Sequence, residues 1–279
     1  MPASACVSIP VPDRAALAHY IRQRVETALG GRVSAGFVPH SEPVERVSTG
    51  IAALDRLTGG MVRGGLNEFS GPASSGRTSV MLAALARAAS DGETCCLVDV
   101  MDSFDPGCAA AAGVKLENVL WVRGGPGQTS PASCKAREKV KTPKIRSIGF
   151  AALEQALKVT DLVLQGGGFG MVVIDLCDVA PPVSRRIPLT SWFRFRRAVE
   201  KTSTVLLVMS QEPNAGTCAS LIVKLEGKRL SRRAGVPESV ISHARLLAGI
   251  QIAAESARER RQPQLARTEF NCENQWKTG

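Results

Sequence analysis

Short apolar runs alternate with helix-type segments along most of the chain, and this alternation limits the possible folds more than any other sequence feature. Strands are predicted over residues 66–70, 94–100, 117–122, 171–177, 204–209 and 219–225, and helices over 78–89, 107–113, 148–164 and 190–201. Near-continuous apolar strands with intervening helices are typical of a parallel sheet buried on both faces. We therefore predict an α/β fold with a mostly parallel sheet and helices on both faces.

The two ends of the chain differ from this pattern. Residues 1–46 are predicted as an arm, with an amphipathic helix over 13–29 and a proline-containing linker after it. The helix could pack on its own core or dock onto a neighbouring protomer, and the sequence leaves both open. Residues 47–226 are the predicted core. Residues 227–279 are predicted as a charged tail, partly helical near 237–260 and disordered at the end.

Composition narrows the classes of partner and compartment. The 279 residues carry a formal net charge of +10, which favours a polyanion such as nucleic acid or an acidic membrane surface. No apolar run is long enough to span a membrane, and the first residues lack the pattern of a secretory signal, so we expect a cytoplasmic protein. The eight cysteines include no Cys-x-x-Cys pair, which argues against zinc and for buried thiols in a reducing compartment.

The most specific local signal is a glycine-rich loop between a predicted strand and a predicted helix. It matches the phosphate-loop pattern G-x-x-x-x-G-K-[ST], with arginine in place of lysine. Glycines let the backbone wrap a phosphate, and the helix amino terminus attracts its charge. The candidate ATP-binding residues are Gly71, Pro72, Ala73, Ser74, Ser75, Gly76, Arg77, Thr78 and Ser79. A glycine-rich turn without a ligand is the alternative.

Two further residues complete the expected nucleotide site. Asp175 ends the apolar strand 171–175, where its carboxylate could hold Mg²⁺ together with the Thr78 hydroxyl. Arg77 is the departure, because a planar guanidinium does not replace the compact ammonium of lysine between phosphate oxygens. The pattern therefore predicts ATP and Mg²⁺ binding with inefficient hydrolysis.

An ordered set of motifs resembles the bacterial RecA recombinase core over about residues 44–226. The chain also looks like shorter RecA-like relatives of the ImuA type, implicated in damage-induced mutagenesis. The residues that carry the resemblance are Ser48-Thr49-Gly50, Leu54-Asp55, Gly71-Pro72, Ser74 to Thr78, Val98-Asp99, Asp105-Pro106, Gly113-Val114, Val172 to Asp175 and Ser210-Gln211. The resemblance implies a RecA-like phosphate-loop core, and it likens the amino-terminal helix to the arm that docks onto neighbouring protomers.

The departures from the family pattern concern catalysis. Met101 stands where the family has the glutamate that activates water, and Asp102 beside it points differently from its neighbour. Cys108 stands at the position of an adenine-stacking tyrosine, whereas Asp105, near the base in the family, is kept. Gln211 matches the glutamine that senses the γ-phosphate. The resemblance thus implies a RecA fold that has lost, or nearly lost, its ATPase.

Single-stranded DNA is the expected nucleic-acid partner. By resemblance, two shortened DNA-binding loops cover 178–189 and 212–218, and the candidate DNA-binding residues are Arg185, Arg186, Arg194 and Arg197. The aromatic stripe of Trp192 and Phe195 with Val199 could stack on bases, but its spacing favours packing on the sheet. The basic segment 124–147 could also contact DNA or be a solvated insertion.

Three functional hypotheses remain from the sequence. The favoured one is a RecA-like DNA repair or recombination protein of the DNA-damage (SOS) or mutagenesis response, which binds single-stranded DNA and ATP with weak or absent hydrolysis. Its partners would be other RecA-like protomers or a translesion polymerase complex. The alternatives are an active ATP-dependent recombinase and an unrelated phosphate-loop kinase. Arg77 and Met101 favour the first hypothesis over the second.

Overall fold

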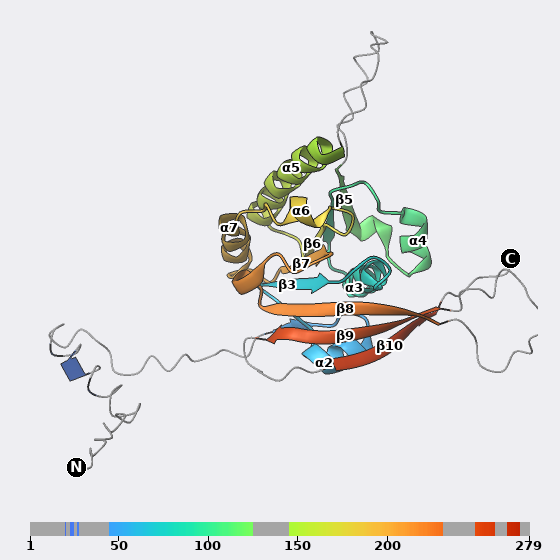
Figure 1. Ribbon diagram of the computed structural model, residues 1–279, viewed down its shortest axis with the longest axis horizontal. Helices are drawn as coiled ribbons and strands as arrows, with labels where there is room; N and C mark the ends of the chain where they lie inside the picture. The colour runs from blue at the N-terminus through green and yellow to red at the C-terminus, as the bar shows by residue number, and fades with distance from the viewer. Residues whose placement is uncertain are drawn as a thin grey trace, which may run out of the picture. The chain divides into compact units, whose positions relative to one another are not determined.

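The sheet at the centre of the molecule follows the predicted pattern. The computed structural model describes residues 45–124, 145–230, 249–259 and 267–273, and the four helical positions 20, 23, 24 and 27. Within these residues, an 8-stranded sheet has the order β10-β9-β8-β3-β7-β6-β4-β5 (Figure 1). The strands are β3 (Gly65–Ser70), β4 (Cys95–Asp99), β5 (Val119–Arg123), β6 (Met171–Asp175), β7 (Val205–Ser210), β8 (Leu221–Leu230), β9 (Gly249–Glu259) and β10 (Arg267–Glu273).

Strand directions divide the sheet into two parts. The strands from β8 to β5 in the sheet order are mutually parallel, whereas β9 and β10 are antiparallel to their neighbours. All the parallel strands therefore present their carboxyl ends at one edge, where ligands bind in open α/β sheets. A separate antiparallel pair joins β1 (Arg46–Val47) to β2 (Met61–Val62).

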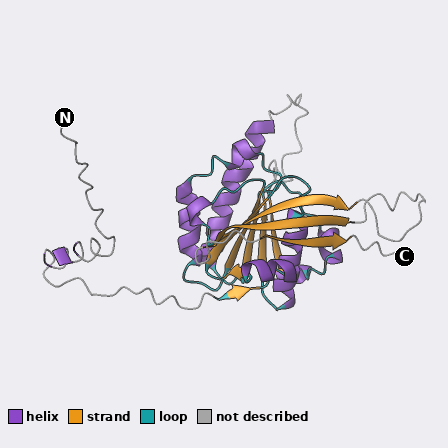
Figure 2. Ribbon diagram, turned by 60° about the horizontal axis from the view of Figure 1, so that its bottom comes forward, coloured by secondary structure: helices purple, strands orange, loops and turns teal. Residues whose placement is uncertain are grey.

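Helices cover both faces of the sheet, as Figure 2 shows. The helices are α2 (Ala52–Thr58), α3 (Arg77–Ser90), α4 (Pro106–Ala111), α5 (Ile145–Gly166), α6 (Pro181–Ser184) and α7 (Leu189–Val199), with 3-10 turns at Leu116–Asn118 and Gly216–Cys218. Among the described residues, no helix is long and apolar enough to cross a membrane.

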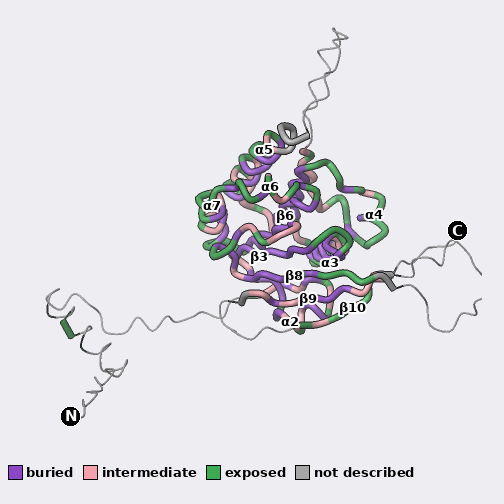
Figure 3. Tube along the Cα trace, in the orientation of Figure 1, coloured by how far each residue is buried: buried purple, intermediate pink, exposed green. Residues whose placement is uncertain are grey.

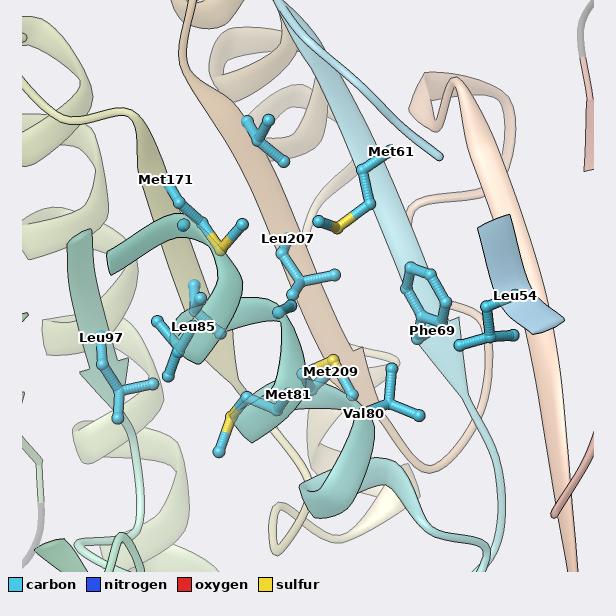
Figure 4. Close-up of a cluster of buried hydrophobic side chains, with 14 of the residues drawn as sticks. Leu54, Met61, Phe69, Val80, Met81, Leu85, Leu97, Met171, Leu207 and Met209 are labelled. Atoms are coloured by element: carbon cyan, nitrogen blue, oxygen red, sulfur yellow. The ribbon is translucent and has the colours of Figure 1, made fainter. Parts of the chain in front are cut away.

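Alternating strand side chains build a separate hydrophobic cluster on each face. One cluster joins α2, α3 and α4 to side chains such as Leu97, Val173 and Leu207, and Figure 4 shows Leu207 and Met209 facing Met81 of α3. The other joins α5 and α7 to the intervening positions, such as Val98 and Ile174. The central strands are consequently buried along their length, as Figure 3 shows.

The aromatic stripe of α7 belongs to the second cluster. Trp192, Phe195 and Val199 are fully or almost fully buried, and the two aromatic rings meet edge to face with centroids 6.0 Å apart. Packing on the sheet is therefore confirmed for these residues, and base stacking by them is excluded.

The carboxyl-terminal prediction is partly wrong. Residues 249–259 form β9 rather than part of a helix, and residues 267–273 form β10. Strand β8 runs to Leu230 and pairs with β9 over its length, so it crosses the expected boundary at 226. Residues 252–254 of β9 are buried, and pairing with a distant strand outweighs the helix propensity of its alanines.

The amino-terminal helix predicted over 13–29 lies mostly outside the described residues. The four described positions, 20, 23, 24 and 27, are helical. Arg24 donates a hydrogen bond to the Tyr20 hydroxyl over 3.3 Å, an i, i+4 contact that is typical of a helix.

Candidate nucleotide and nucleic-acid site

The loop between β3 and α3 exposes the amino terminus of a 14-residue helix. Gly76 is the N-cap residue with a φ of 86°, and no side chain caps the helix there. The first N–H groups of α3 thus lack a side-chain acceptor, which is the arrangement that binds anions. Thr78 is exposed in the first turn, and Ser79 is half-buried behind it.

Strands β8 and β9 pack directly against this loop. A Cβ atom on Gly76 would lie 2.1 Å from Ile252 Cδ1, and one on Gly71 would lie 2.3 Å from the Leu225 carbonyl oxygen. A Cβ atom on Gly227 would lie 2.1 Å from the Ser74 carbonyl oxygen. The loop is therefore shaped by the carboxyl-terminal strands, which sequence reasoning missed. A glycine at 227 within a strand was the available signal for such a close approach.

Arg77 is directed toward the loop after β6, a strand that β7 separates from β3 in the sheet. Its side chain is buried, and Nη1 donates a hydrogen bond to the carbonyl oxygen of Cys177 over 3.2 Å. A lysine in this place would reach phosphate as a point charge, whereas this guanidinium is held by protein. A phosphate would compete with this carbonyl oxygen for the guanidinium.

Asp175 lies at the end of β6, as the sequence predicted for a magnesium ligand. Its carboxylate is buried, and Oδ1 accepts a hydrogen bond from the Cys177 N–H over 2.8 Å. Burial raises the pKa of the Asp175 carboxyl, so a cation beside it would offset the cost of its charge. In the described part of the chain, no group of three or more acidic, histidine or cysteine residues could hold a metal ion alone.

The loop after β4 carries Met101, at the position where the sequence predicted the loss of a catalytic base, and Asp102 beside it. The Met101 side chain is exposed, and its thioether cannot accept a proton in this chemistry. Asp102 receives two hydrogen bonds of 2.8 Å each from Arg123 of β5, and this pairing lowers the pKa of its carboxyl. Asp102 is thus a fixed anion of the turn, and Arg123 is a partner that sequence reasoning missed.

Asp99, the last residue of β4, holds the loop that follows this strand. Its buried carboxylate accepts hydrogen bonds from the N–H groups of Ser103 and Phe104 and from Trp121 Nε1, at 3.1, 2.8 and 3.3 Å. The Arg123 guanidinium lies over the Trp121 ring, 4.6 Å from its centroid. These contacts support the turn on which Asp102 pairs with Arg123.

Asp105 and Cys108 lie together at the start of α4. Asp105 caps the helix by accepting the Gly107 N–H over 2.8 Å. A hydrogen bond from the Cys108 thiol, and then the one from the Gly107 N–H, lower the pKa of the Asp105 carboxyl. Both residues are exposed. Cys108 offers no flat ring, so adenine stacking of the kind that a tyrosine gives is absent at this position.

Gln211 follows β7 and reaches the loop after β6. Its Nε2 atom donates to the carbonyl oxygens of Cys177 and Val179, at 3.0 and 3.3 Å. Gln211 and Arg77 therefore meet at the same carbonyl group, and the Cys177 backbone joins the phosphate loop to both predicted DNA-binding loops.

The four candidate DNA-binding arginines are not equivalent. Arg185 pairs with Glu212, and Arg194 pairs with Asp161 of α5 over 2.8 Å. Arg186 and Arg197 are exposed, and no carboxylate of the described residues pairs with either. Arg197 lies in the last turn of α7, which runs back from the edge at which Arg186 lies, so the structure does not bring all four together.

One sequence expectation cannot be placed at this site. The basic segment 124–147 lies outside the described residues except for Gly124 and the start of α5 at 145.

Of the eight cysteines, Cys95, Cys96, Cys177 and Cys218 are buried, as expected for thiols that pack as apolar groups. Burial raises the pKa of Cys95 to about 12 and that of Cys96 to about 11, so these thiols stay protonated.

A nucleotide phosphate with Mg²⁺ fits these residues in part. The uncapped amides of α3 suit a phosphate, and Ser75 Oγ is buried at the loop without a hydrogen-bond partner among the described residues. Thr78 and Asp175 supply oxygens of the kind that Mg²⁺ prefers. Arg77, held at Cys177, departs from a fully formed phosphate site. Fold and site together define a phosphate-loop α/β protein.

Comparisons with known proteins narrow this class. The model of the RecA N-terminal domain matches residues 23–132. Protein RecA of Rickettsia canadensis (strain McKiel) is 31% identical over 143 residues, which cover 50% of this chain and 34% of the relative. Protein RecA of Rickettsia massiliae (strain Mtu5) is 25% identical over 212 residues, which cover 75% of this chain and 54% of the relative.

A solved structure agrees at the level of the fold. The RadB recombinase crystal structure superposes with a TM-score of 0.51 at 18% identity, covering 80% of this chain and 94% of that one. The family model and the relatives show that part of this chain is similar to RecA, and the RadB structure shares its fold. The chain spans about a third to a half of the length of the curated relatives described above.

Proposed function

We propose that this chain is a RecA-like DNA recombination or repair protein that binds nucleotide and single-stranded DNA but hydrolyses ATP weakly or not at all. One observation carries the proposal about hydrolysis. The loop that should hold a catalytic base offers Met101 and an Asp102 already bound twice by Arg123. General-base catalysis needs a group that is free to accept a proton, and neither side chain is such a group.

The chain's own residues suit binding better than turnover. Backbone amides at the start of α3 would hold the phosphates, and Thr78 with Asp175 would hold Mg²⁺. When bound, Mg²⁺ with the nucleotide would supply charge neutralisation at the phosphates. Arg77 is hydrogen-bonded to the Cys177 carbonyl oxygen through Nη1, so a phosphate would compete with this internal hydrogen bond for the guanidinium.

DNA binding is proposed at the sheet edge where β6 and β7 end. The net charge of +10 supports a polyanion partner, and exposed Arg186 lies at this edge without an ion pair among the described residues. A role in damage-induced mutagenesis, a translesion polymerase partner, a cytoplasmic location and self-association through the amino-terminal helix remain predictions from the sequence.

An active recombinase is the second candidate, and Gln211 favours it. This glutamine bridges the loops after β6 and β7, as a residue that transmits nucleotide binding to DNA would. Binding of a fluorescent non-hydrolysable ATP analogue, and of a labelled deoxythymidine oligonucleotide by fluorescence anisotropy, tests the proposal. We expect both to bind. Failure to bind the oligonucleotide at low salt would contradict the proposed function.

A further inference from the structure

The loops after β6 and β7 are joined by an ion pair between Arg185 and Glu212. Two side-chain nitrogens of Arg185, Nε and Nη2, donate to Glu212 Oε2, with Nε at 2.9 Å. The pair is solvent-exposed, since the side chains keep 64% and 43% of their accessible surface. A pair this exposed contributes little to stability, so a competing anion could displace it.

Glu212 is held in place by the protein around it. Its carbonyl oxygen accepts hydrogen bonds from Ser210 Oγ over 2.8 Å and from Asn214 Nδ2 over 2.7 Å. The buried carboxylate of Glu68 then accepts the N–H groups of Asn214 and Ala215, at 2.6 and 3.1 Å. The loop that carries Glu212 is therefore anchored to β3.

Arg185 is also positioned before any ligand binds. It is the C-cap residue of α6, and its N–H donates to the Pro181 carbonyl oxygen over 3.0 Å. Its neighbour Arg186 projects from the same turn without such a carboxylate partner among the described residues. One arginine of this adjacent pair is thus neutralised and the other is not.

We propose that Glu212 is an internal competitor for nucleic-acid phosphate, which occupies Arg185 until the backbone of a single strand displaces it. A carboxylate and a phosphate bind the guanidinium fork in the same way, so one excludes the other. The proposal rests on the proposed DNA binding. It means that the protein binds single strands less tightly than its arginines would allow, and that Glu212 sets this limit.

The test measures binding of a labelled deoxythymidine oligonucleotide to the full chain over a range of salt. Glu212→Gln should bind about fivefold more tightly, the effect of removing one exposed competing charge. Its salt dependence should steepen by about 0.7 in log–log slope, as one more phosphate contact to a single strand predicts.

Asp91→Asn is the matched control, because it changes net charge equally. Asp91 pairs with Arg87 at similar exposure, at the end of α3 and thus away from the carboxyl edge of the sheet. This variant should bind DNA like the wild type. An equal gain in both variants would show a general charge effect and overturn the proposal.

The double variant Arg185→Gln/Glu212→Gln separates competition from repulsion. The gain from Glu212→Gln should disappear when Arg185 is also replaced, because the freed arginine produces it. A gain that persists without Arg185, or weaker binding by Glu212→Gln alone, would overturn the proposal while leaving the proposed function standing. Absence of DNA binding by every variant would overturn both.

Discussion

The Arg77 guanidinium and the Cys177 carbonyl oxygen lie 3.2 Å apart and share a hydrogen bond that joins the phosphate loop to the loop after β6. Gln211 donates to the same oxygen over 3.0 Å. The residue at the usual phosphate-lysine position therefore takes part in a contact between three loops. This contact and the held carboxylate of Asp102 support a site that binds more readily than it turns over.

Arg77→Lys alone should not restore ATP hydrolysis. The substitution supplies the compact ammonium, but Met101 still lacks a base and Arg123 still holds Asp102. Steady-state phosphate release should remain near the background rate, whereas adding Met101→Glu should raise it. Robust turnover by Arg77→Lys without the second change would contradict the role assigned to Met101.

Gly76→Ala should destabilise the fold more than Gly92→Ala. Both glycines have positive φ, 86° and 82°, but a Cβ atom at Gly76 meets Ile252 at 2.1 Å and one at Gly92 meets nothing within 4 Å. The difference in unfolding free energy, measured with denaturant, should be about 1–3 kcal/mol, the cost of overpacking. Equal losses would mean that β9 does not pack on the phosphate loop.

Glu68→Gln should destabilise the loop after β7. A glutamine oxygen cannot accept both the Asn214 and Ala215 N–H groups as the carboxylate does, and one unsatisfied buried N–H costs about 1–3 kcal/mol. Denaturant unfolding at neutral pH would measure this loss. No loss of unfolding free energy would contradict the anchoring role of Glu68.

The contribution of Glu68 to the unfolding free energy should depend on pH. Burial raises the pKa of the Glu68 carboxyl, so the folded chain binds this proton more readily than the unfolded chain. The unfolding free energy of the wild type should then fall as pH rises from about 4.3, the ordinary glutamate pKa, through the raised pKa. The difference in unfolding free energy between the wild type and Glu68→Gln should therefore decrease as pH rises over this range. An increase would contradict a raised pKa of Glu68.

Arg186→Gln should weaken single-strand binding and reduce the log–log salt slope by about 0.7. Arg194→Gln is the comparison, since Arg194 is paired with Asp161 of α5 and should contribute less. Anisotropy titrations at several salt concentrations measure both. An unchanged slope for Arg186→Gln would move the DNA contact to another surface.

The sequence predicted the parallel core well because its signals are local. Apolar runs such as 171–175 and the loop at 71–78 carry their structure in adjacent residues. Strands β9 and β10 were missed because they depend on pairing with distant residues, although Ile250, Ile252 and Ala254 alternate with polar or small neighbours as a half-buried strand does.

The sequence identified residues of the candidate site, but it could not predict the contacts that these residues make. Position and type identified Arg77, Asp175 and Gln211. That Arg77 is held by a backbone carbonyl, and that Arg185 is paired with Glu212, follows only from the three-dimensional arrangement of loops far apart in sequence.

ATP turnover by the purified chain, with and without single-stranded DNA, tests the central claim most directly. Nucleotide binding measured in the same samples shows whether the phosphate loop is occupied. We expect nucleotide binding with turnover at or near background, unchanged by DNA. Turnover that single-stranded DNA strongly stimulates would contradict it and identify an active recombinase.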